Sequence, residues 1–293
     1  MPRTARRPSR LAHRVFRARD ALRDGLLTPA QLRGPAWLQV LHGVYADARL
    51  PLDHGLRTRA AALAVPRDVA ITGVSAAWLW GARLASPTDP VDLVRRPGRR
   101  LGSSPRYRIR SCTLDAADLD ELGGIRLTTP LRTAWELAQR LDPVEAVAYC
   151  DALAARGRFD AAALSRYLRD RAGRRGCRPA RRVFEWVDAR AESPAESRLR
   201  VRLTLAGLPP PVPQYEVRAG GHLLARVDLA WPEPRVAVEY DGLWHAEARQ
   251  LIHDRRRLNR LQAAGWYVHH VTVGDLPHLD TVVAQLRRAL RQR

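Results

Sequence analysis

The chain contains no lysine, so all 50 of its lysine-plus-arginine residues are arginine. Cysteine is also scarce, with three residues among 293. Cys112, Cys150 and Cys177 are odd in number and widely spaced, which excludes a disulfide framework and a paired-cysteine metal site. We therefore expect a reducing compartment, the cytoplasm.

Long apolar runs are missing as well. The longest suggestive stretch, residues 69–82, is too short to span a bilayer, and no membrane partner is expected. The first 19 residues hold seven arginines and no acid, but no continuous apolar segment follows, so they differ from a secretory signal. A basic arm that touches phosphates, a solvated tail and an organellar transit peptide remain open for this segment.

What is present is positive charge. Fifty arginines against 30 acidic residues give a net charge of +20, which favours a polyanionic partner, nucleic acid first and an anionic membrane surface second. The densest basic run, Arg166 to Arg182, is interrupted by glycine and proline. It predicts an exposed linker, either a solvated hinge or a hinge that also contacts phosphate.

The N-terminal part predicts the skeleton of a winged helix. We expect a helix over residues 11–24, a short helix from Thr28-Pro29 to Leu32, and extended chain from Trp37 to Tyr45. The phrases GLLTPAQL and HGVYAD, and later ITGVSAAWLWG and GIRLTTPLRTAWELA, resemble AbiEi-type antitoxin proteins. Only four residues separate Leu32 from Trp37, so a long recognition helix has no room and little base-specific reading is expected there.

The C-terminal hundred residues carry a pattern of acids. Ser193-Pro194 predict the start of a helix with Glu196 in its first turn. Two strands, LARVDLAW and RVAVEYDG, follow and are joined through Pro232-Glu233-Pro234. Alternation places Asp228 and Glu239 on one face, directly opposite each other, where two carboxylates can share a cation. The alternative is an exposed strand face with scattered acids.

The combination Glu196 … Asp228 … Glu239-x-Asp241-Gly-x-x-His245 resembles the PD-(D/E)XK nuclease superfamily. More narrowly, it resembles a bacterial family of unknown function related to very-short-patch-repair (Vsr-like) endonucleases. The segment HDRRRLNRLQAAGWYVHHVTVGDL, residues 253–276, belongs to the same resemblance, which covers about a third of the chain. It implies a restriction-endonuclease-like mixed α/β sheet flanked by helices.

The resemblance also implies a division of roles. Asp228 and Glu239 would bind Mg²⁺, with Mn²⁺ as a substitute, and Glu196 would hold a metal-bound water or a second metal. Asp241 stands where the superfamily usually has lysine, so His245 is the best substitute as general base or phosphate contact. We expect Asp254 and Arg257, three residues apart on the following helix, to support the site.

These observations predict an α/β protein in four segments. They are a degenerate winged-helix-like segment with a basic arm (1–52), an AbiEi-like α+β middle region (53–165), an arginine-rich linker (166–192) and an endonuclease-like domain (193–293). The first functional hypothesis is a metal-dependent DNA endonuclease of repair or defence. The second is an AbiEi-like antitoxin or DNA-binding transcriptional regulator with an inactive nuclease-like domain. DNA is the expected partner, and a cognate toxin or a repair or defence protein is a further one.

Overall fold

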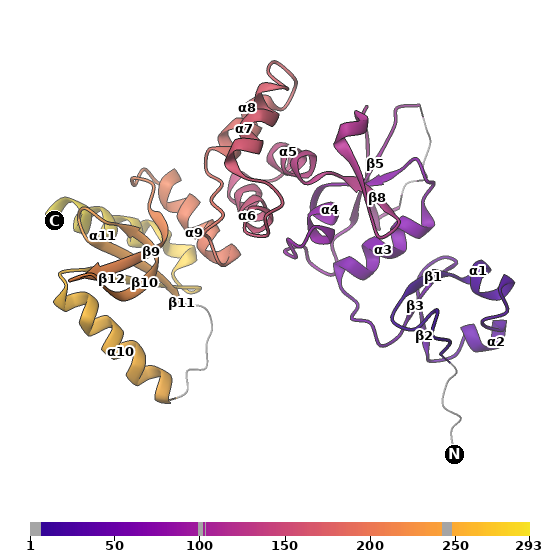
Figure 1. Ribbon diagram of the computed structural model, residues 1–293, viewed down its shortest axis with the longest axis horizontal. Coiled ribbons are helices and arrows are strands. Elements are labelled where there is room, and N and C mark those ends of the chain that lie inside the picture. The colour runs from indigo at the N-terminus through magenta and orange to yellow at the C-terminus, as the bar shows by residue number, and fades with distance from the viewer. Residues whose placement is uncertain (1–6, 99–101, 103, 242–247) are drawn as a thin grey trace. The chain divides into compact units, whose positions relative to one another are not determined.

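The structure is a computed structural model that describes residues 7–98, 102, 104–241 and 248–293, with only the backbone described for residues 248–255. It has a mixed α/β fold with three sheets (Figure 1). Its contacts divide the chain into two compact units, Met1–Gln139 and Arg140–Arg293. This boundary lies inside the middle region predicted for residues 53–165. Among the described residues, no helix is both long and apolar enough to cross a membrane.

The first unit begins with a small antiparallel sheet in the order β1-β3-β2. Its elements are β1 (Val15–Arg17), α1 (Ala18–Arg23), α2 (Pro29–Leu32), β2 (Trp37–Leu41) and β3 (Val44–Asp47). The predicted helix over residues 11–24 is therefore wrong in its first half. Val15 and Phe16 are good strand formers and pair with β3. The ring of Phe16 also packs edge-on against the ring of Trp37, with 5.2 Å between the ring centroids. These contacts with distant residues determine the structure here, although the spacing of the apolar residues favoured a helix.

The short helix α2 agrees with its prediction. Thr28 and Gln31 form a reciprocal capping box at its start, and Pro29 occupies the first helical turn. The chain then enters β2 with no further helix between them, as the four-residue gap required.

A mixed five-stranded sheet, in the order β6-β5-β4-β8-β7, follows in the same unit. Its elements are α3 (His54–Ala64), β4 (Ala70–Ile71), α4 (Gly73–Leu79), β5 (Val91–Arg95), β6 (Tyr107–Ser111), η1 (Ala116–Asp118), β7 (Leu119–Leu122), β8 (Ile125–Thr128) and α5 (Pro130–Arg140). Ile71, Leu93 and Leu127, from the three central strands, are fully buried and form part of its core.

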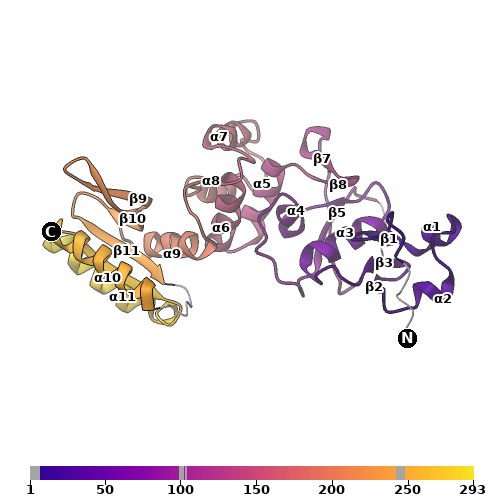
Figure 2. The ribbon, with the colours of Figure 1, turned by 60° about the horizontal axis from the view of Figure 1, so that its bottom comes forward.

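The second unit opens with helices rather than a linker. These are α6 (Pro143–Ala154), α7 (Ala161–Arg169) and α8 (Cys177–Phe184), which lie together in Figure 2. The linker predicted for residues 166–192 is wrong, because α8 buries Cys177, Ala180 and Val183 while its arginines face solvent. An apolar stripe at spacing of three is what an amphipathic helix needs, and the density of arginine concealed it.

The rest of the second unit has the predicted order of helix, strand, hairpin, helix, strand and helix. The elements are α9 (Pro194–Leu205), β9 (Val212–Ala219), β10 (His222–Trp231), β11 (Val236–Asp241), α10 (Ala248–Ala263), β12 (Tyr267–Thr272), η2 (Leu276–His278) and α11 (Leu279–Gln292). The strands form one mixed sheet in the order β12-β11-β10-β9, with β11 and β12 parallel.

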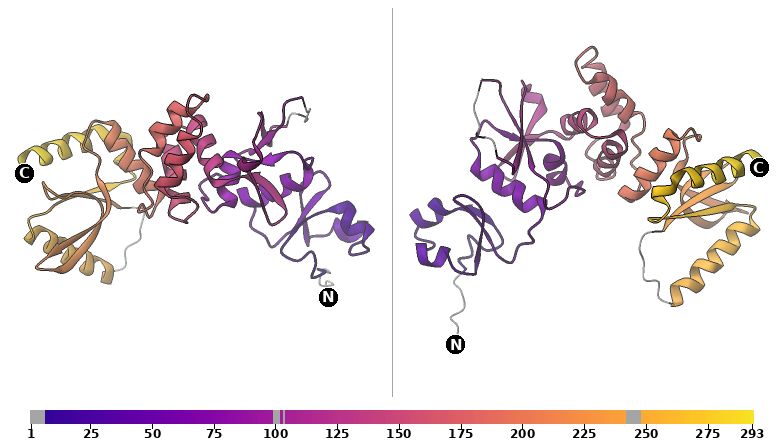
Figure 3. Two further views of the ribbon diagram at one scale, coloured as in Figure 1. Left: turned by 45° about the horizontal axis from the view of Figure 1, so that its top comes forward. Right: turned by 180° about the vertical axis from the view of Figure 1, so that it is seen from behind.

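Helices cover both faces of this C-terminal sheet (Figure 3). Leu229, Trp231, Val236 and Val238 form a core with side chains of α9 and α11. Ala230 and Ala237, on the other face, pack with Leu261 of α10 and with Trp266. Alternation along the two strands predicts this separation of Leu229 and Trp231 from Ala230, but it also predicts Val227 beside Leu229, and Val227 packs instead with the two alanines.

Candidate active site

Strand pairing aligns four polar residues across the C-terminal sheet. The pairs on either side of Asp228 place it opposite Gln214 of β9. The register of the pairs from Leu229 to Trp231, continued by one residue, places Asp228 opposite Glu239 of β11. Glu239 is in turn the partner of His270 on the parallel strand β12. We call Gln214, Asp228, Glu239 and His270 the polar row. The predicted hairpin register is confirmed by the pairs between β10 and β11.

Asp228 lies where the backbone pairing of β10 with β9 skips one residue and where its pairing with β11 ends. Its Oδ2 accepts the backbone N–H of Tyr240 at 2.8 Å, and its Oδ1 accepts the Gln214 amide at 3.4 Å. Thus the Asp228 carboxylate accepts an N–H group of the neighbouring strand β11. Burial raises its pKa, and the charge of Asp241 acts in the same direction.

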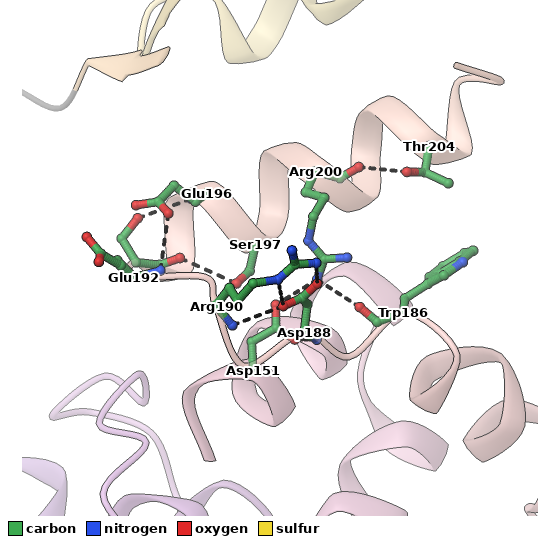
Figure 4. A network of polar contacts seen from close by, with 10 residues as sticks. Asp151, Trp186, Asp188, Arg190, Glu192, Glu196, Ser197, Arg200 and Thr204 are labelled. Carbon is green, nitrogen blue, oxygen red and sulfur yellow. Dashed lines mark hydrogen bonds and ion pairs between the residues drawn. The ribbon is translucent and has the colours of Figure 1, made fainter. Parts of the chain in front are cut away.

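Glu196 reaches the row from the first turn of α9. Ser193 caps the helix by accepting the Glu196 N–H at 3.2 Å. The Glu196 Oε2 atom accepts the Gln214 amide at 2.8 Å and the Glu192 N–H at 3.1 Å, the latter drawn in Figure 4. Glu196 is only 8% exposed, and burial raises its pKa, with a further contribution from the charge of Asp228.

Glu239 is a carboxylate with a strongly raised pKa. Burial raises its pKa to about 7, although Arg257 opposes the shift, and the charges of Asp228 and Asp241 add to it. Arg257 of α10 donates to the Glu239 Oε1 atom at 2.5 Å and to the Arg226 carbonyl at 2.8 Å. Arg257, which was predicted to support the site, forms a direct ion pair with Glu239.

Asp241 has a different partner from the other acids. Its Oδ2 atom lies 2.9 Å from Nδ1 of His270, and both side chains are exposed. Two of the predicted residues cannot be placed in this geometry. His245 lies outside the described residues, and Asp254 lies in α10 where only the backbone is described.

Sequence reasoning missed Gln214 and His270. Gln214 has a φ of +51°, in the left-handed region that side chains other than glycine seldom adopt. The signal that could have placed Gln214 opposite Asp228 is the Gly220-Gly221 turn, but counting residues back from this turn along β9 gives the pairing only once the shift of register within β10 is included. His270 joins the row only through the parallel pairing of β11 and β12, which no local pattern announces.

The donor chemistry of this site suits a hard divalent cation. Carboxylate and amide oxygens are what Mg²⁺ and Mn²⁺ prefer. Nevertheless, within the part of the chain that the structure describes, no three His, Cys, Asp or Glu side chains are gathered closely enough to hold a metal. The Gln214 amide lies between Glu196 and Asp228, and Arg257 is bound to Glu239. A cation shared by these acids would have to displace such contacts.

The helix that carries Glu196 is fixed by a buried polar network (Figure 4). Arg200 donates from Nη2 to Asp151 of α6 and to the Trp186 carbonyl, both at 2.8 Å. The Asp188 N–H also donates to Asp151 at 2.8 Å. Arg200 and Asp151 are almost fully buried. The position of Glu196 therefore depends on residues before 193, outside the predicted endonuclease-like domain.

The raised pKa of Glu239 predicts a pH-dependent stability. The folded protein binds this proton more tightly than the unfolded chain, so its stabilising effect is complete below the ordinary value of 4.5 and is lost as pH rises to about 7. We expect the free energy of unfolding of wild type, relative to Glu239→Gln, to fall by roughly 2–3 kcal/mol across this window. Urea unfolding of both proteins through the window measures it, and parallel profiles would contradict it.

By its fold, the second unit is a mixed α/β domain in which three buried or partly buried carboxylates, Glu196, Asp228 and Glu239, lie in or beside one sheet. No family model matches the chain. Two Mycobacterium tuberculosis proteins, Uncharacterized protein MT2308 (strain CDC 1551 / Oshkosh) and Uncharacterized protein Rv2248 (strain ATCC 25618 / H37Rv), are each 32% identical to it over 251 residues, which is 84% of this chain and 89% of each relative. The chain belongs to the same family as these two proteins. The crystal structure of the RV2827C protein from the same species aligns with 73% of this chain and 85% of its own, at 17% identity and a TM-score of 0.41.

Proposed function

We propose that the protein is a metal-dependent DNA endonuclease that hydrolyses phosphodiester bonds. The observation that carries this proposal is the polar row, in which Asp228 and Glu239 are held on adjacent strands with Glu196 beside them. Several carboxylates buried close together lower the stability of the folded protein. Groups with strongly perturbed pKa values mark candidate functional sites. The resemblance to the PD-(D/E)XK superfamily names the same three acids.

In this proposal Glu196, Asp228 and Glu239 would hold the cation. When bound, Mg²⁺ or Mn²⁺ neutralises phosphate charge and makes water a better nucleophile. Arg257 is a permanent cation beside Glu239, positioned by the Arg226 carbonyl, and is available to a phosphate once Glu239 has another partner.

Proton transfer is assigned to imidazole because the chain has no lysine. His245 remains the proposed general base. His270 is a second candidate, since a Nδ1–H donated to Asp241 leaves the Nε2 lone pair free to accept a proton. The test of the whole proposal is nicking of supercoiled plasmid with Mg²⁺, with Mn²⁺ and with EDTA. Nicking that requires a divalent cation supports the proposal. An equal extent of nicking with Mg²⁺, with Mn²⁺ and with EDTA contradicts it.

DNA binding is proposed to depend mainly on charge. In the first unit, a surface hollow is lined by Arg17, Arg19, His42 and Arg67, and the whole chain carries +20. Basic side chains around a concave surface fit a phosphate backbone.

We therefore expect the logarithm of the DNA association constant to fall linearly with the logarithm of salt concentration, with a slope of about −0.9 per phosphate neutralised. Different duplex sequences should give similar affinities and slopes. Fluorescence anisotropy with labelled duplexes across a salt series measures both. A flat salt response, or one sequence bound far more tightly than its scrambled counterpart, would contradict this part of the proposal.

A second candidate function is a DNA-binding regulator or AbiEi-like antitoxin whose nuclease-like domain is inactive. The pairing of Glu239 with Arg257 favours it, because a carboxylate neutralised by a fixed arginine does not need a metal. The absence of lysine at position 241 acts in the same direction. The salt-dependent binding described above is common to both candidates, whereas divalent-dependent nicking belongs to the endonuclease alone.

A further inference from the structure

Helix α8 presents three arginines on its exposed side. Arg178, Arg181 and Arg182 stand at i, i+3 and i+4, the spacing that brings side chains together on one face of a helix. We call these three residues the α8 arginine face. Among the side chains that the structure describes, none forms an ion pair with them, and this includes exposed Glu185 at the end of the helix.

The surroundings of this face add positive charge and do not compensate for it. The segment from Arg166 to Arg182 holds eight arginines and one acid, Asp170. Further exposed arginines lie on α7 and in the turn before α8, and these are Arg166, Arg169, Arg174 and Arg175. Like charges at i, i+3 and i+4 destabilise a helix, so an anionic ligand would relieve a repulsion that the free protein carries.

Contacts at the end of α8 hold this face in the same packed unit as the candidate site. The guanidinium of Arg182 lies over the Trp186 ring, 5.2 Å from its centroid. The Trp186 carbonyl accepts a hydrogen bond of 2.8 Å from Arg200 of α9, the helix that carries Glu196 (Figure 4). Both α8 and α9 also pack on α6. A ligand bound on α8 is therefore carried by the same helices that position Glu196.

We propose that the α8 arginine face binds the phosphate backbone of duplex DNA. The inference rests on the DNA binding proposed above and deepens it, because it gives the second unit a DNA contact of its own, separate from the hollow of the first unit. Arginine donates paired hydrogen bonds to a phosphate and keeps its charge at every physiological pH. Contacts to the backbone carry no direct sequence information, so the face binds different sequences alike.

An anionic membrane surface is the other partner that positive charge alone would suit. A helix that lies on a membrane inserts an apolar face between the lipids. The apolar side of α8 is already used in the core, since Cys177, Ala180 and Val183 are buried. The exposed residues of α8 are three arginines and Pro179. This composition favours the phosphate backbone of a nucleic acid over a lipid surface.

The experiment measures DNA affinity of the full-length protein by fluorescence anisotropy across a salt series. Arg178→Gln combined with Arg181→Gln removes two charges from the face. The logarithm of the association constant, plotted against the logarithm of salt concentration, should have a slope shallower by about one per arginine removed, for every duplex sequence. The melting temperature of this α8 variant without DNA should equal or exceed that of wild type, because a repulsion is removed.

The matched control is Arg288→Gln combined with Arg291→Gln. These two arginines are also exposed and also three residues apart on a helix of the second unit, α11. The α11 variant loses the same charge as the α8 variant, so it measures the effect of net charge alone. Its slope should stay close to that of wild type.

The outcomes separate this inference from the proposed function. A shallower slope confined to the α8 variant supports the inference. An unchanged slope in the α8 variant, or equal changes in the α8 and α11 variants, overturns the inference and leaves DNA binding in place. Absence of salt-dependent binding in wild type overturns both. Loss of binding to phosphatidylserine vesicles in the α8 variant, with DNA binding unchanged, also overturns the inference.

A measurement on wild type decides the matter if the α8 variant does not fold. Phenylglyoxal modifies accessible arginines, and mass spectrometry reports the rate at each position. Duplex DNA should slow the modification of Arg178 and Arg181 severalfold and leave Arg288 and Arg291 unchanged. Equal protection of the two pairs, or none at Arg178 and Arg181, overturns the inference.

Discussion

Replacing Asp228 by asparagine is expected to reduce divalent-dependent DNA cleavage by about 10³-fold or more. A metal ligand contributes several kcal/mol of transition-state stabilisation, and each 1.4 kcal/mol is a factor of ten in rate. The fold should survive, because the asparagine Oδ1 atom can still accept the Tyr240 N–H that Asp228 accepts at 2.8 Å. The measurement is the initial rate of plasmid nicking with Mg²⁺ and with Mn²⁺.

The control comes from the same hairpin. Glu233 lies exposed in the turn between β10 and β11, so Glu233→Gln removes one negative charge without touching the polar row. It should cleave at the wild-type rate. If wild type cleaves no faster than Asp228→Asn with either metal, on duplex, mismatched or single-stranded DNA, the endonuclease proposal fails and the regulator replaces it.

The part of the site that could be predicted from sequence is the part set by local rules. A turn of Pro232-Glu233-Pro234 fixes the register of its two strands, and alternation then fixes the faces. The same rules predicted the helix start at Ser193, which places Glu196 in the first turn. The positions of Asp228, Glu239 and Glu196 in their strands and helix are therefore determined by their neighbours in the sequence.

The rest depends on contacts between distant segments. His270 meets Asp241 only because β12 returns parallel to β11, across a helix and 29 positions of chain. The Gln214 side chain contacts Glu196 from a left-handed φ that residues other than glycine seldom adopt, so its local sequence does not predict this contact. Arg257 was predicted to be near the site, but its choice of Glu239 as partner depends on where α10 packs on the sheet.

Two wrong predictions have a common cause. Residues 15–17 became a strand and residues 177–184 became a helix, although the first was predicted as helix and the second as an exposed linker. In both places arginine surrounds a few apolar residues, and its long aliphatic stem tolerates a strand, a helix face or a loop. In such arginine-rich segments, burial of residues such as Phe16 and Val183 decides the structure, and burial is visible only once the fold is known.

The largest effect on stability is expected at Arg200. Arg200→Met leaves Asp151, which is only 1% exposed, without its cationic partner in a buried site. Breaking a buried ion pair from one side typically costs about 3–5 kcal/mol, because the remaining charge has lost its compensation. We expect a loss of this size in the free energy of unfolding, measured by urea at neutral pH, with a much smaller loss when Asp151 is also replaced by leucine.

Arg198 provides the matched control on the same helix. It pairs with Glu145 of α6 through two hydrogen bonds of 2.6 and 2.8 Å, but both side chains are about one-third exposed. Exposed pairs contribute about 0–1 kcal/mol, so Arg198→Met should be nearly neutral. Equal losses of stability at Arg198 and Arg200 would contradict the difference that their burial predicts. A loss confined to Arg200 would mean that the buried pair with Asp151 fixes the helix from which Glu196 reaches the polar row.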